Sequence, residues 1–377
     1  MRLESILFRN YKSIKHLQME MRGLTCLVGP NNSGKSNLID AFAFMRDVAQ
    51  KGLAKAVETR DANRIRYYGA PDSEPVSFEI SISESQRHPT DHSGFLYSLK
   101  LTPDCTAVAE ERIERVNEGT KVSVFSATMK DDIVTIDFAQ NRTTTGRSNS
   151  SPAFEWYAHR VPEAARVKNF LSSLQFYRFV PDLLKRPGPA QMVDRLERDG
   201  QNFSSYVHAV QVSYKKQFAR IETELRKNFP DIEELATQLT PAGTTEVMIQ
   251  ERWFDRMAYG SQLSDGLMGF LAHLFALYGP DDPPLVVFEE PENYIHPRLM
   301  QRLVDMLKGA AESRQVVLST HSVQLINQLE LGDLLVIERD REGATTGRRI
   351  EARKALEDAL REWALGDAYI SGVLDAA

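Results

Sequence analysis

A phosphate-binding loop near the N-terminus constrains the fold of this chain more than any other feature. Residues 29–36 read Gly-Pro-Asn-Asn-Ser-Gly-Lys-Ser and satisfy every fixed position of the pattern Gly-x-x-x-x-Gly-Lys-Ser. A strand-like apolar run at 24–28 leads into the loop, and a helix-like run at 37–42 follows it. A P-loop requires this strand–loop–helix order, so the sequence predicts an α/β fold that binds a nucleotide.

The residue types in the loop explain how it would hold phosphate. Gly29 and Gly34 permit a tight turn in which successive backbone N–H groups point at phosphate oxygens. The start of the following helix adds partial positive charge. We expect Lys35 to reach the β- and γ-phosphates and the Ser36 hydroxyl to bind Mg²⁺. The predicted nucleotide-binding residues of this segment are Gly29, Asn31, Asn32, Ser33, Gly34, Lys35, Ser36 and Asn37.

Composition limits the classes of protein to which the chain can belong. With 42% hydrophobic and 26% charged residues among 377, it is typical of globular proteins. The net charge of −6 gives no global basic field, so any contact with DNA would need a local patch or a partner. Cys26 and Cys105 are too few for a disulfide framework or a metal cluster. The N-terminus lacks the apolar run of a signal peptide, and the apolar stretch at 267–278 is too short to cross a bilayer. We expect a cytoplasmic protein with no membrane partner.

Periodicity divides the chain into four segments. Alternating residues at 3–8 and 13–19 predict a hairpin, and further strand patterns dominate 76–138. Residues 141–151 form a polar loop, the pattern from 191 to about 239 is helical, and a helical tail follows around 356–365. We therefore expect an ATPase lobe at 1–75, an antiparallel β-subdomain at 76–150, a strand plus helical arm at 151–245, and a second ATPase lobe at 246–377.

An apolar run at 285–288 ends in two carboxylates, Glu289 and Glu290. Such a run fits a strand buried in a parallel sheet, and ligands of open α/β sheets lie beyond the carboxyl ends of the strands. We assign Glu289 to Mg²⁺ and Glu290 to orienting or deprotonating the attacking water. The alternative is a surface Glu-Glu turn.

Two further motifs flank the acidic strand. Ser264, Asp265 and Gly266 precede the helical pattern at 267–278, where a helix N-terminus offers N–H donors to an anion. They could equally be a simple N-cap. Another strand pattern ends at His321, whose ring could hydrogen-bond a γ-phosphate or the attacking water. A structural histidine is the alternative there.

The order of P-loop, Leu-Ser-Asp-Gly, acidic strand and histidine resembles the ABC-type ATPase head. The residue patterns at 8–14 (Phe-Arg-Asn-Tyr-Lys-Ser-Ile), 288–293 and 319–322 resemble those of the SMC/RecF/OLD-like branch of AAA/ABC ATPases. This resemblance implies an α/β head with a mixed core sheet, an antiparallel β-subdomain and an inserted α-helical arm. Many members of the branch have Asp where Glu289 stands. Which of Glu289 and Glu290 binds the metal and which acts on water therefore stays open.

The resemblance also implies how the residues work together. Two copies of the chain would sandwich two ATP molecules, each between one P-loop and the Ser264 and Gly266 of the other copy. Lys12 and Ser13 would lie near the nucleotide. The glutamine that contacts the nucleotide in such heads stays open between Gln175 and Gln191.

The expected role is a DNA-associated ATPase switch in genome maintenance or anti-phage defence. Two basic clusters could meet DNA phosphates, although solvated helix faces explain them equally well: Arg60, Arg64 and Arg66, and Lys215, Lys216 and Arg220. Only 56 residues follow His321 (377 − 321), too few for the Toprim nuclease domain of OLD-type proteins. We therefore expect a separately encoded effector, such as a nuclease. The alternative is a slow ATPase that acts as a protein-interaction scaffold and holds or inhibits an effector.

Overall fold

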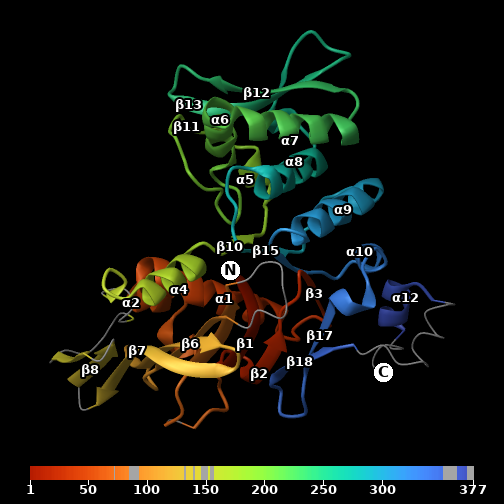
Figure 1. The fold of residues 1–377 in the computed structure, drawn as a ribbon. Helices are drawn as coiled ribbons and strands as arrows, with labels where there is room; N and C mark the ends of the chain where they lie inside the picture. Colours follow the sequence, from red (N-terminus) through yellow and green to blue (C-terminus); the bar gives the residue numbers. More distant parts are fainter. Residues whose placement is uncertain are drawn as a thin grey trace. The chain divides into compact units, whose positions relative to one another are not determined.

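The computed structural model describes residues 1–71, 73–84, 93–130, 133–138, 141–145, 152, 157–350 and 363–371, with only the backbone at 63 and 141–145. The chain forms two compact units (Figure 1). Unit 1 comprises Met1–Leu174 and Leu334–Ile350, and unit 2 comprises Gln175–Asp333 with helix α12 (Leu365–Ile370). The predicted helical tail around 356–365 lies almost entirely outside the described residues. None of the described helices has the length and hydrophobicity needed to span a bilayer.

Unit 1 contains an eight-stranded antiparallel sheet in the order β2-β1-β4-β5-β6-β7-β8-β9. The predicted N-terminal hairpin is confirmed as β1 and β2, and it joins the predicted antiparallel strands in one sheet. The prediction of a loop at 141–151 is wrong for Asn141–Thr145, because its β-branched threonines extend the sheet by pairing with β8. The strands are β1 (Arg2–Tyr11), β2 (Ile14–Glu20), β4 (Ser77–Ser83), β5 (Gly94–Leu101), β6 (Val108–Asn117), β7 (Thr120–Lys130), β8 (Ile133–Phe138) and β9 (Asn141–Thr145).

An aromatic cluster fixes helix α1 on this sheet. The ring of Phe42 on α1 meets Phe8 of β1 edge to face, with centroids 5.4 Å apart. Phe44 stacks on Phe78 of β4, also at 5.4 Å. Such pairs add to the free energy gained by burying the rings. Figure 1 shows α1 and α4 along the same face of the sheet. The helices of this layer are α1 (Lys35–Lys51), α2 (Leu53–Glu58), η1 (Ala62–Arg64) and α4 (Pro162–Ser172).

A second, smaller group of strands in unit 1 carries the P-loop. Strand β3 (Leu24–Val28) is fully buried and runs parallel to β17 (Leu334–Arg339), as an apolar run without alternation predicts. Strand β18 (Thr345–Arg349) pairs antiparallel with β17. The loop from β3 to α1 therefore lies beside residues more than 300 positions away in the sequence.

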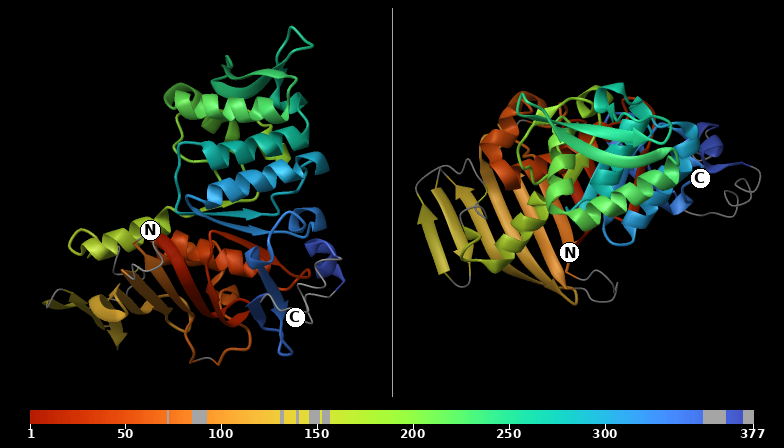
Figure 2. Two further views of the ribbon diagram at one scale, coloured as in Figure 1. Left: turned by 45° about the vertical axis from the view of Figure 1, so that its right-hand side comes forward. Right: turned by 90° about the horizontal axis from the view of Figure 1, so that it is seen from above.

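Unit 2 is built on three parallel strands in the order β10-β15-β16. The strand predictions at 285–290 and 315–321 are confirmed as β15 and β16, and the helix at 267–278 as α8. Helix α9 packs on β16, α8 on α9, and α7 on α8, a stack visible in Figure 2. The elements are β10 (Gln175–Tyr177), α5 (Pro181–Leu184), η2 (Gly260–Gln262), α8 (Asp265–Tyr278), β15 (Leu285–Glu289), η3 (Pro297–Leu299), α9 (Met300–Ala311), β16 (Gln315–Ser319), α10 (Val323–Ile326) and η4 (Leu331–Asp333).

The predicted helical arm of unit 2 also contains strands. Helices α6 (Phe203–Ser213) and α7 (Lys215–Asn228) are confirmed, but the helical prediction is wrong for β12 (Ile232–Leu239). A bulge between Ile232 and Glu234 lets Ile232 and Leu235, three positions apart, both be buried. That spacing resembles a helix face in the sequence. Strand β12 pairs with β13 (Thr244–Glu251), which also pairs with β11 (Gly188–Pro189) and β14 (Ala258–Tyr259).

Candidate nucleotide-binding site

The P-loop in unit 1 adopts a conformation that only glycine tolerates at two positions. Gly34 has φ 109°, and a Cβ there would lie 2.0 Å from Thr345 Oγ1. A Cβ on Gly29 would lie 2.0 Å from the carbonyl oxygen of Ile337. The loop backbone is thus pressed against β17 and β18, which explains the two fixed glycines of the motif.

The side chains of the loop divide into buried and exposed groups. The Lys35 ammonium donates to the carbonyl oxygens of Gly29 at 2.7 Å and Pro30 at 3.0 Å, and the residue is only 7% exposed. Ser33 is buried, whereas Asn31, Asn32 and Ser36 are exposed. The Ser36 hydroxyl is therefore accessible in the first turn of α1. Arg339 at the end of β17 donates to the carbonyl of Asn32 at 2.7 Å and holds the outer part of the loop.

A buried hydrogen-bond chain ties the turn after β1 to the P-loop helix. The Ser13 hydroxyl lies 2.7 Å from Thr345 Oγ1 and accepts from Asn37 Nδ2 at 2.7 Å. Thr345 Oγ1 also donates to the carbonyl of Ser33 at 3.0 Å. Ser13, Asn37 and Ser33, all predicted site residues, are thus brought together. Thr345, which sequence reasoning missed, connects them.

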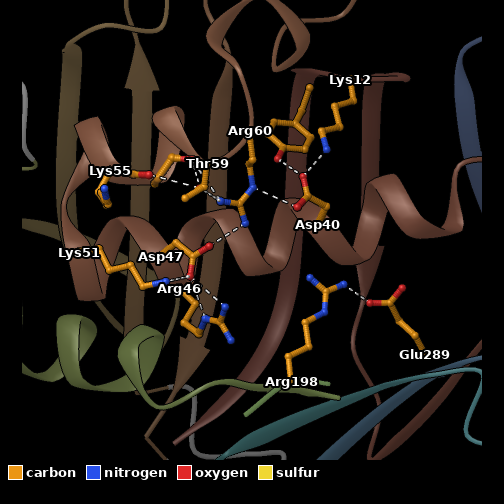
Figure 3. A network of polar contacts seen from close by, with 12 residues as sticks. Lys12, Asp40, Arg46, Asp47, Lys51, Lys55, Thr59, Arg60, Arg198 and Glu289 are labelled. Atoms are coloured by element: carbon orange, nitrogen blue, oxygen red, sulfur yellow. Dashed lines mark hydrogen bonds and ion pairs between the residues drawn. The ribbon is translucent and has the colours of Figure 1, made fainter. Parts of the chain in front are cut away.

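A buried ion network lies behind the turn that carries Lys12 (Figure 3). Asp40 on α1 accepts from Lys12 at 2.6 Å, from Tyr11 at 2.5 Å and from Arg60 at 3.0 Å. Arg60 also pairs with Asp47 at 2.8 Å. Burial alone would raise the pKa of Asp40, but the Arg60 charge and the hydrogen bonds from Lys12 and Tyr11 lower it below its usual value. Lys12 is therefore held by an ionised carboxylate.

This network corrects one expectation about DNA. The Arg60 side chain is only 8% exposed and its charge is neutralised by two aspartates, so it is not available to a phosphate. Arg64 is exposed, with 77% of its side chain accessible. Arg60, Arg64 and Arg66 are therefore not one surface cluster.

A cavity of about 870 Å³ opens beside the P-loop within unit 1. Its volume lies in the range typical of pockets that hold small molecules. The lining combines cations, aromatic rings and the predicted residues of the turn and helix: Lys12, Ser13, Asn37, Arg64, Arg66, Tyr67, Tyr68, Gly69, Arg339, Glu342 and Gly343. Tyr67 and Tyr68 belong to no recognised motif in the sequence.

In unit 2, the Leu-Ser-Asp-Gly motif begins helix α8. The Ser264 hydroxyl caps the helix by accepting from the Leu267 N–H at 3.3 Å, so the simple N-cap role is present. Asp265 forms an ion pair with Lys185. A Cβ on Gly266 would lie 2.9 Å from the carbonyl oxygen of Tyr294. The motif therefore packs directly on the turn that follows the acidic strand.

The acidic strand and the histidine lie at the same edge of the unit 2 sheet. The parallel register places Glu289 opposite Ser319, as expected for the carboxyl ends of neighbouring strands. Glu290 has a positive φ of 48°, its N–H donates to the carbonyl of Ser319 at 2.9 Å, and its carboxylate accepts from Asn293 at 2.7 Å. His321 is exposed two residues past β16. The predicted pair Glu290 and His321 thus occupies adjoining loops.

Comparison with known proteins gives the family. The family model described as "AAA domain, putative AbiEii toxin, Type IV TA system" matches residues 24–327, most of the chain. The chain belongs to this AAA family. The match begins at the strand before the P-loop and ends just past His321.

Curated relatives of this AAA protein are distant in sequence. It is 20% identical to the Retron Ec83 probable ATPase of Escherichia coli, over 98% of this chain and 76% of the relative. It is 19% identical to an ATP/GTP phosphatase of Helicobacter pylori, over 90% of this chain and 89% of the relative. It is 24% identical to the Old nuclease of Escherichia phage P2 over 96% of this chain, and spans 62% of that nuclease.

Solved structures show the same fold. The SMC head bound to the C-winged helix domain of ScpA superposes with a TM-score of 0.57 at 17% identity, covering 95% of this chain and all of that chain. The Pyrococcus furiosus SMC head bound to the C-terminal domain of ScpA gives 0.52 at 14% identity, over 96% and 98% of the two chains. Together with the family match, this shows an ATPase with the ABC-type head of the SMC/OLD-like branch.

Glu289, the carboxylate assigned to Mg²⁺, has the chemistry of a cation ligand. Glu289 is 9% exposed at the end of β15, and its carboxylate pairs with the Arg198 guanidinium (Figure 3). A carboxylate at this position already accepts a positively charged partner, and carboxylate oxygens are the ligands that Mg²⁺ prefers. Arg198 was missed because no motif marks its position. Within the described residues no cluster of three or more His, Cys, Asp or Glu side chains forms a separate metal site.

The AAA protein also contains a half-buried carboxylate to which no sequence motif assigned a role. Glu292 accepts from the Thr320 hydroxyl at 2.5 Å and from the His321 N–H at 3.2 Å. A signal was nevertheless present in the sequence, since Glu292 follows the acidic pair and Pro291 directly. Of the two glutamines left open, Gln175 is buried and accepts from Tyr177, whereas Gln191 is exposed. Neither contact assigns the nucleotide-binding glutamine.

Proposed function

We propose that this ATPase binds ATP and Mg²⁺ between two copies of the chain and acts as a DNA-associated switch, working with a separately encoded effector. The P-loop residues 29–37 hold the phosphates, with Lys35 on the β- and γ-phosphates. Ser36 and Glu289 are the Mg²⁺ ligands. Bound Mg²⁺ supplies charge stabilisation to the transferring phosphoryl group, which is its usual contribution to this chemistry.

The cavity beside the P-loop is the proposed site of the nucleoside. It adjoins Ser13 and Asn37, which are hydrogen-bonded to each other, and Lys12, which Asp40 holds in place. Tyr67 and Tyr68 supply aromatic faces for a base, and the basic side chains suit a ligand with a phosphate tail.

The observation that carries the hydrolytic assignment is the conformation of Glu290. A non-glycine residue with positive φ costs free energy and persists only where the surrounding structure enforces it. Here the enforced position follows a fully buried strand and places a carboxylate beside the loop of His321. We propose that Glu290 orients or deprotonates water and that His321 contacts the γ-phosphate or that water.

Substitution of Glu290 tests this assignment. The Glu290→Gln variant should bind ATP with unchanged affinity, lose turnover and accumulate as an ATP-dependent dimer on gel filtration. Lost turnover with a dimer that forms only in the presence of ATP supports the proposal. Normal hydrolysis by this variant shows that another residue activates water.

The composite site makes a second, independent prediction. Lys35→Ala and Ser264→Arg variants should each be inactive alone, because each copy contributes one half of both sites. A mixed dimer of the two contains one site with an intact P-loop and an intact Ser264, so mixing should restore part of the activity. A mixture as inactive as its components rules out sites shared between copies.

Helix α7 is the proposed DNA contact. Its first turn contains Lys215 and Lys216, both exposed, and no acidic residue. Cations at a helix N-terminus are disfavoured by the helix dipole, so their presence needs another reason, and phosphate binding supplies one. Duplex DNA should raise the ATPase rate of the wild-type protein, and Lys215→Glu with Lys216→Glu should abolish that response while leaving the basal rate unchanged.

The scaffold alternative remains the second candidate, supported by exposed aromatic side chains at the β13–β14 turn, Trp253 at 66% and Phe254 at 62% exposure. Absence of any DNA response, with a partner protein bound tightly, would favour it. Roles in defence or genome maintenance are proposed from relatives named as a retron ATPase, a phage nuclease and SMC proteins.

A further inference from the structure

The carboxylate of Glu292 bridges the two loops that carry the hydrolytic residues of unit 2. Its Oε1 accepts the Thr320 hydroxyl at 2.5 Å and the backbone N–H of His321 at 3.2 Å. Thr320 is fully buried, and Glu292 is half-buried. One oxygen of Glu292 therefore fixes both the side chain before His321 and the backbone of His321.

The other oxygen of the Glu292 carboxylate lowers the stability of the fold. Oε2 is buried and has no hydrogen-bond partner within the described residues. Burial raises the pKa of Glu292, and the neighbouring Glu290 charge adds to this effect. The hydrogen bonds from Thr320 and His321 both use Oε1, and the carbonyl oxygen of a glutamine could accept them at the same place. Leaving Oε2 buried and unpaired costs free energy. Costs of this kind persist mainly where function requires them.

Two backbone hydrogen bonds shape the acidic turn without involving His321. The Glu290 N–H bonds the carbonyl of Ser319 at 2.9 Å, and the Asn293 N–H bonds the carbonyl of Glu290 at 3.0 Å. The first attaches the turn to the end of β16, and the second closes the turn on itself. The side chain of Glu292 extends this attachment past the strand end to the histidine.

We propose that Glu292 is a positioning residue for hydrolysis, which keeps His321 in register with Glu290. This inference rests on the proposed roles of Glu290 and His321. Because the reacting groups must meet within a fraction of an ångström, a residue that fixes one loop against the other affects the chemical step more than nucleotide binding.

Steady-state kinetics of Glu292 variants test the proposal. Glu292→Ala removes the acceptor, and kcat should fall about 100-fold with KM and ATP affinity nearly unchanged. Glu292→Gln keeps an acceptor at the same place and should restore kcat to within about 3-fold of wild type. Glu312→Ala, an exposed glutamate after α9, is the matched control and should leave kcat unchanged.

A double-mutant cycle measures whether the losses in kcat are coupled, which they would not be if Glu292 only stabilised the fold. Thr320→Val should lower kcat by itself, and it also serves if Glu292→Ala fails to fold. Combining Thr320→Val with Glu292→Ala should lower kcat little further, since both substitutions remove the same hydrogen bond. Glu292→Ala should likewise add little in a His321→Ala background. Fully additive losses in either cycle overturn the proposal.

The outcomes separate this inference from the function on which it rests. If Glu290→Gln and His321→Ala lose turnover while Glu292→Ala keeps normal kcat, the positioning role alone is wrong. If Glu290→Gln hydrolyses ATP normally, the hydrolytic assignment has failed and the role of Glu292 is overturned with it. A Glu292→Gln variant as slow as Glu292→Ala also overturns positioning by hydrogen bonding.

Discussion

The two units differ in how they hold their predicted site residues. In unit 1, Ser13 and Ser33 are joined through Thr345, more than 300 residues from either, and the charges of Asp40 and Arg60 are paired. In unit 2, the acidic turn and the histidine loop are joined by contacts at most 29 residues apart. The binding half is thus held by contacts between distant segments of the chain, whereas the hydrolytic half is held by contacts within one short segment.

The comparison predicts that a substitution in the P-loop removes ATP binding itself. Lys35→Ala should weaken ATP binding by at least about 100-fold, because it removes charge-assisted hydrogen bonds to phosphate. Binding of a fluorescent ATP analogue measures this loss, and the melting temperature should change little. Tight ATP binding by the variant would mean that the loop backbone alone provides the affinity.

The ion network of unit 1 should be the most sensitive structural element. Arg60→Met leaves Asp40 and Asp47 without their shared partner in a setting where the arginine is 8% exposed. Asp40 keeps Lys12 and Tyr11, and Asp47 keeps Arg46, so the loss of unfolding free energy should lie near the lower end of the roughly 3–5 kcal/mol for an uncompensated buried charge. Denaturant unfolding measures the loss, with Arg64→Met, an exposed neighbour, as the control. Equal stabilities of the two variants would contradict a framework role for the network.

The glycine framework allows a matched test. Gly34→Ala combines a φ of 109° with a Cβ 2.0 Å from Thr345, and should cost about 3 kcal/mol or more. Gly343→Ala has a φ of 81° but nothing within 4 Å of its Cβ, and should cost only about 1 kcal/mol. Denaturant unfolding of both variants checks the difference. If the costs are equal, close packing of the P-loop on β18 contributes nothing beyond backbone strain.

The same contrast shows what the sequence could and could not predict. The P-loop, the start of α8 and the strand ends at Glu289 and Ser319 follow from local periodicity and short motifs, and the structure confirms their elements. Thr345 and the burial of Arg60 depend on pairing between distant segments, so no local pattern reveals them. The helical reading of Ile232–Leu239 failed because a bulge mimics helical spacing.

The smallest expected effect is a difference between the two units in how their stability depends on pH. His273 in α8 is fully buried, its ring lies against Phe179 and Phe288, and burial lowers its pKa to about 4. The unfolded chain, with a histidine pKa of 6.5, then binds the extra proton first on acidification. Stability from neutral His273 is therefore full above pH 6.5 and is lost as pH falls toward 4, by about 2 kcal/mol between pH 6.5 and 5.

Asp40 and Asp47 in unit 1 have lowered pKa values because the opposing charge of Arg60, with Lys12 and Arg46, outweighs the effect of burial. Their contribution is present above the usual carboxyl pKa of 3.8 and is lost only as pH falls below it. Hydrogen exchange should therefore show unit 2 loosening at pH 5 while unit 1 stays protected. His273→Leu should remove this loosening, and His159→Leu, an exposed histidine of unit 1, should not. If both units lose protection together at pH 5, they unfold as one cooperative body and local chemistry does not set the order.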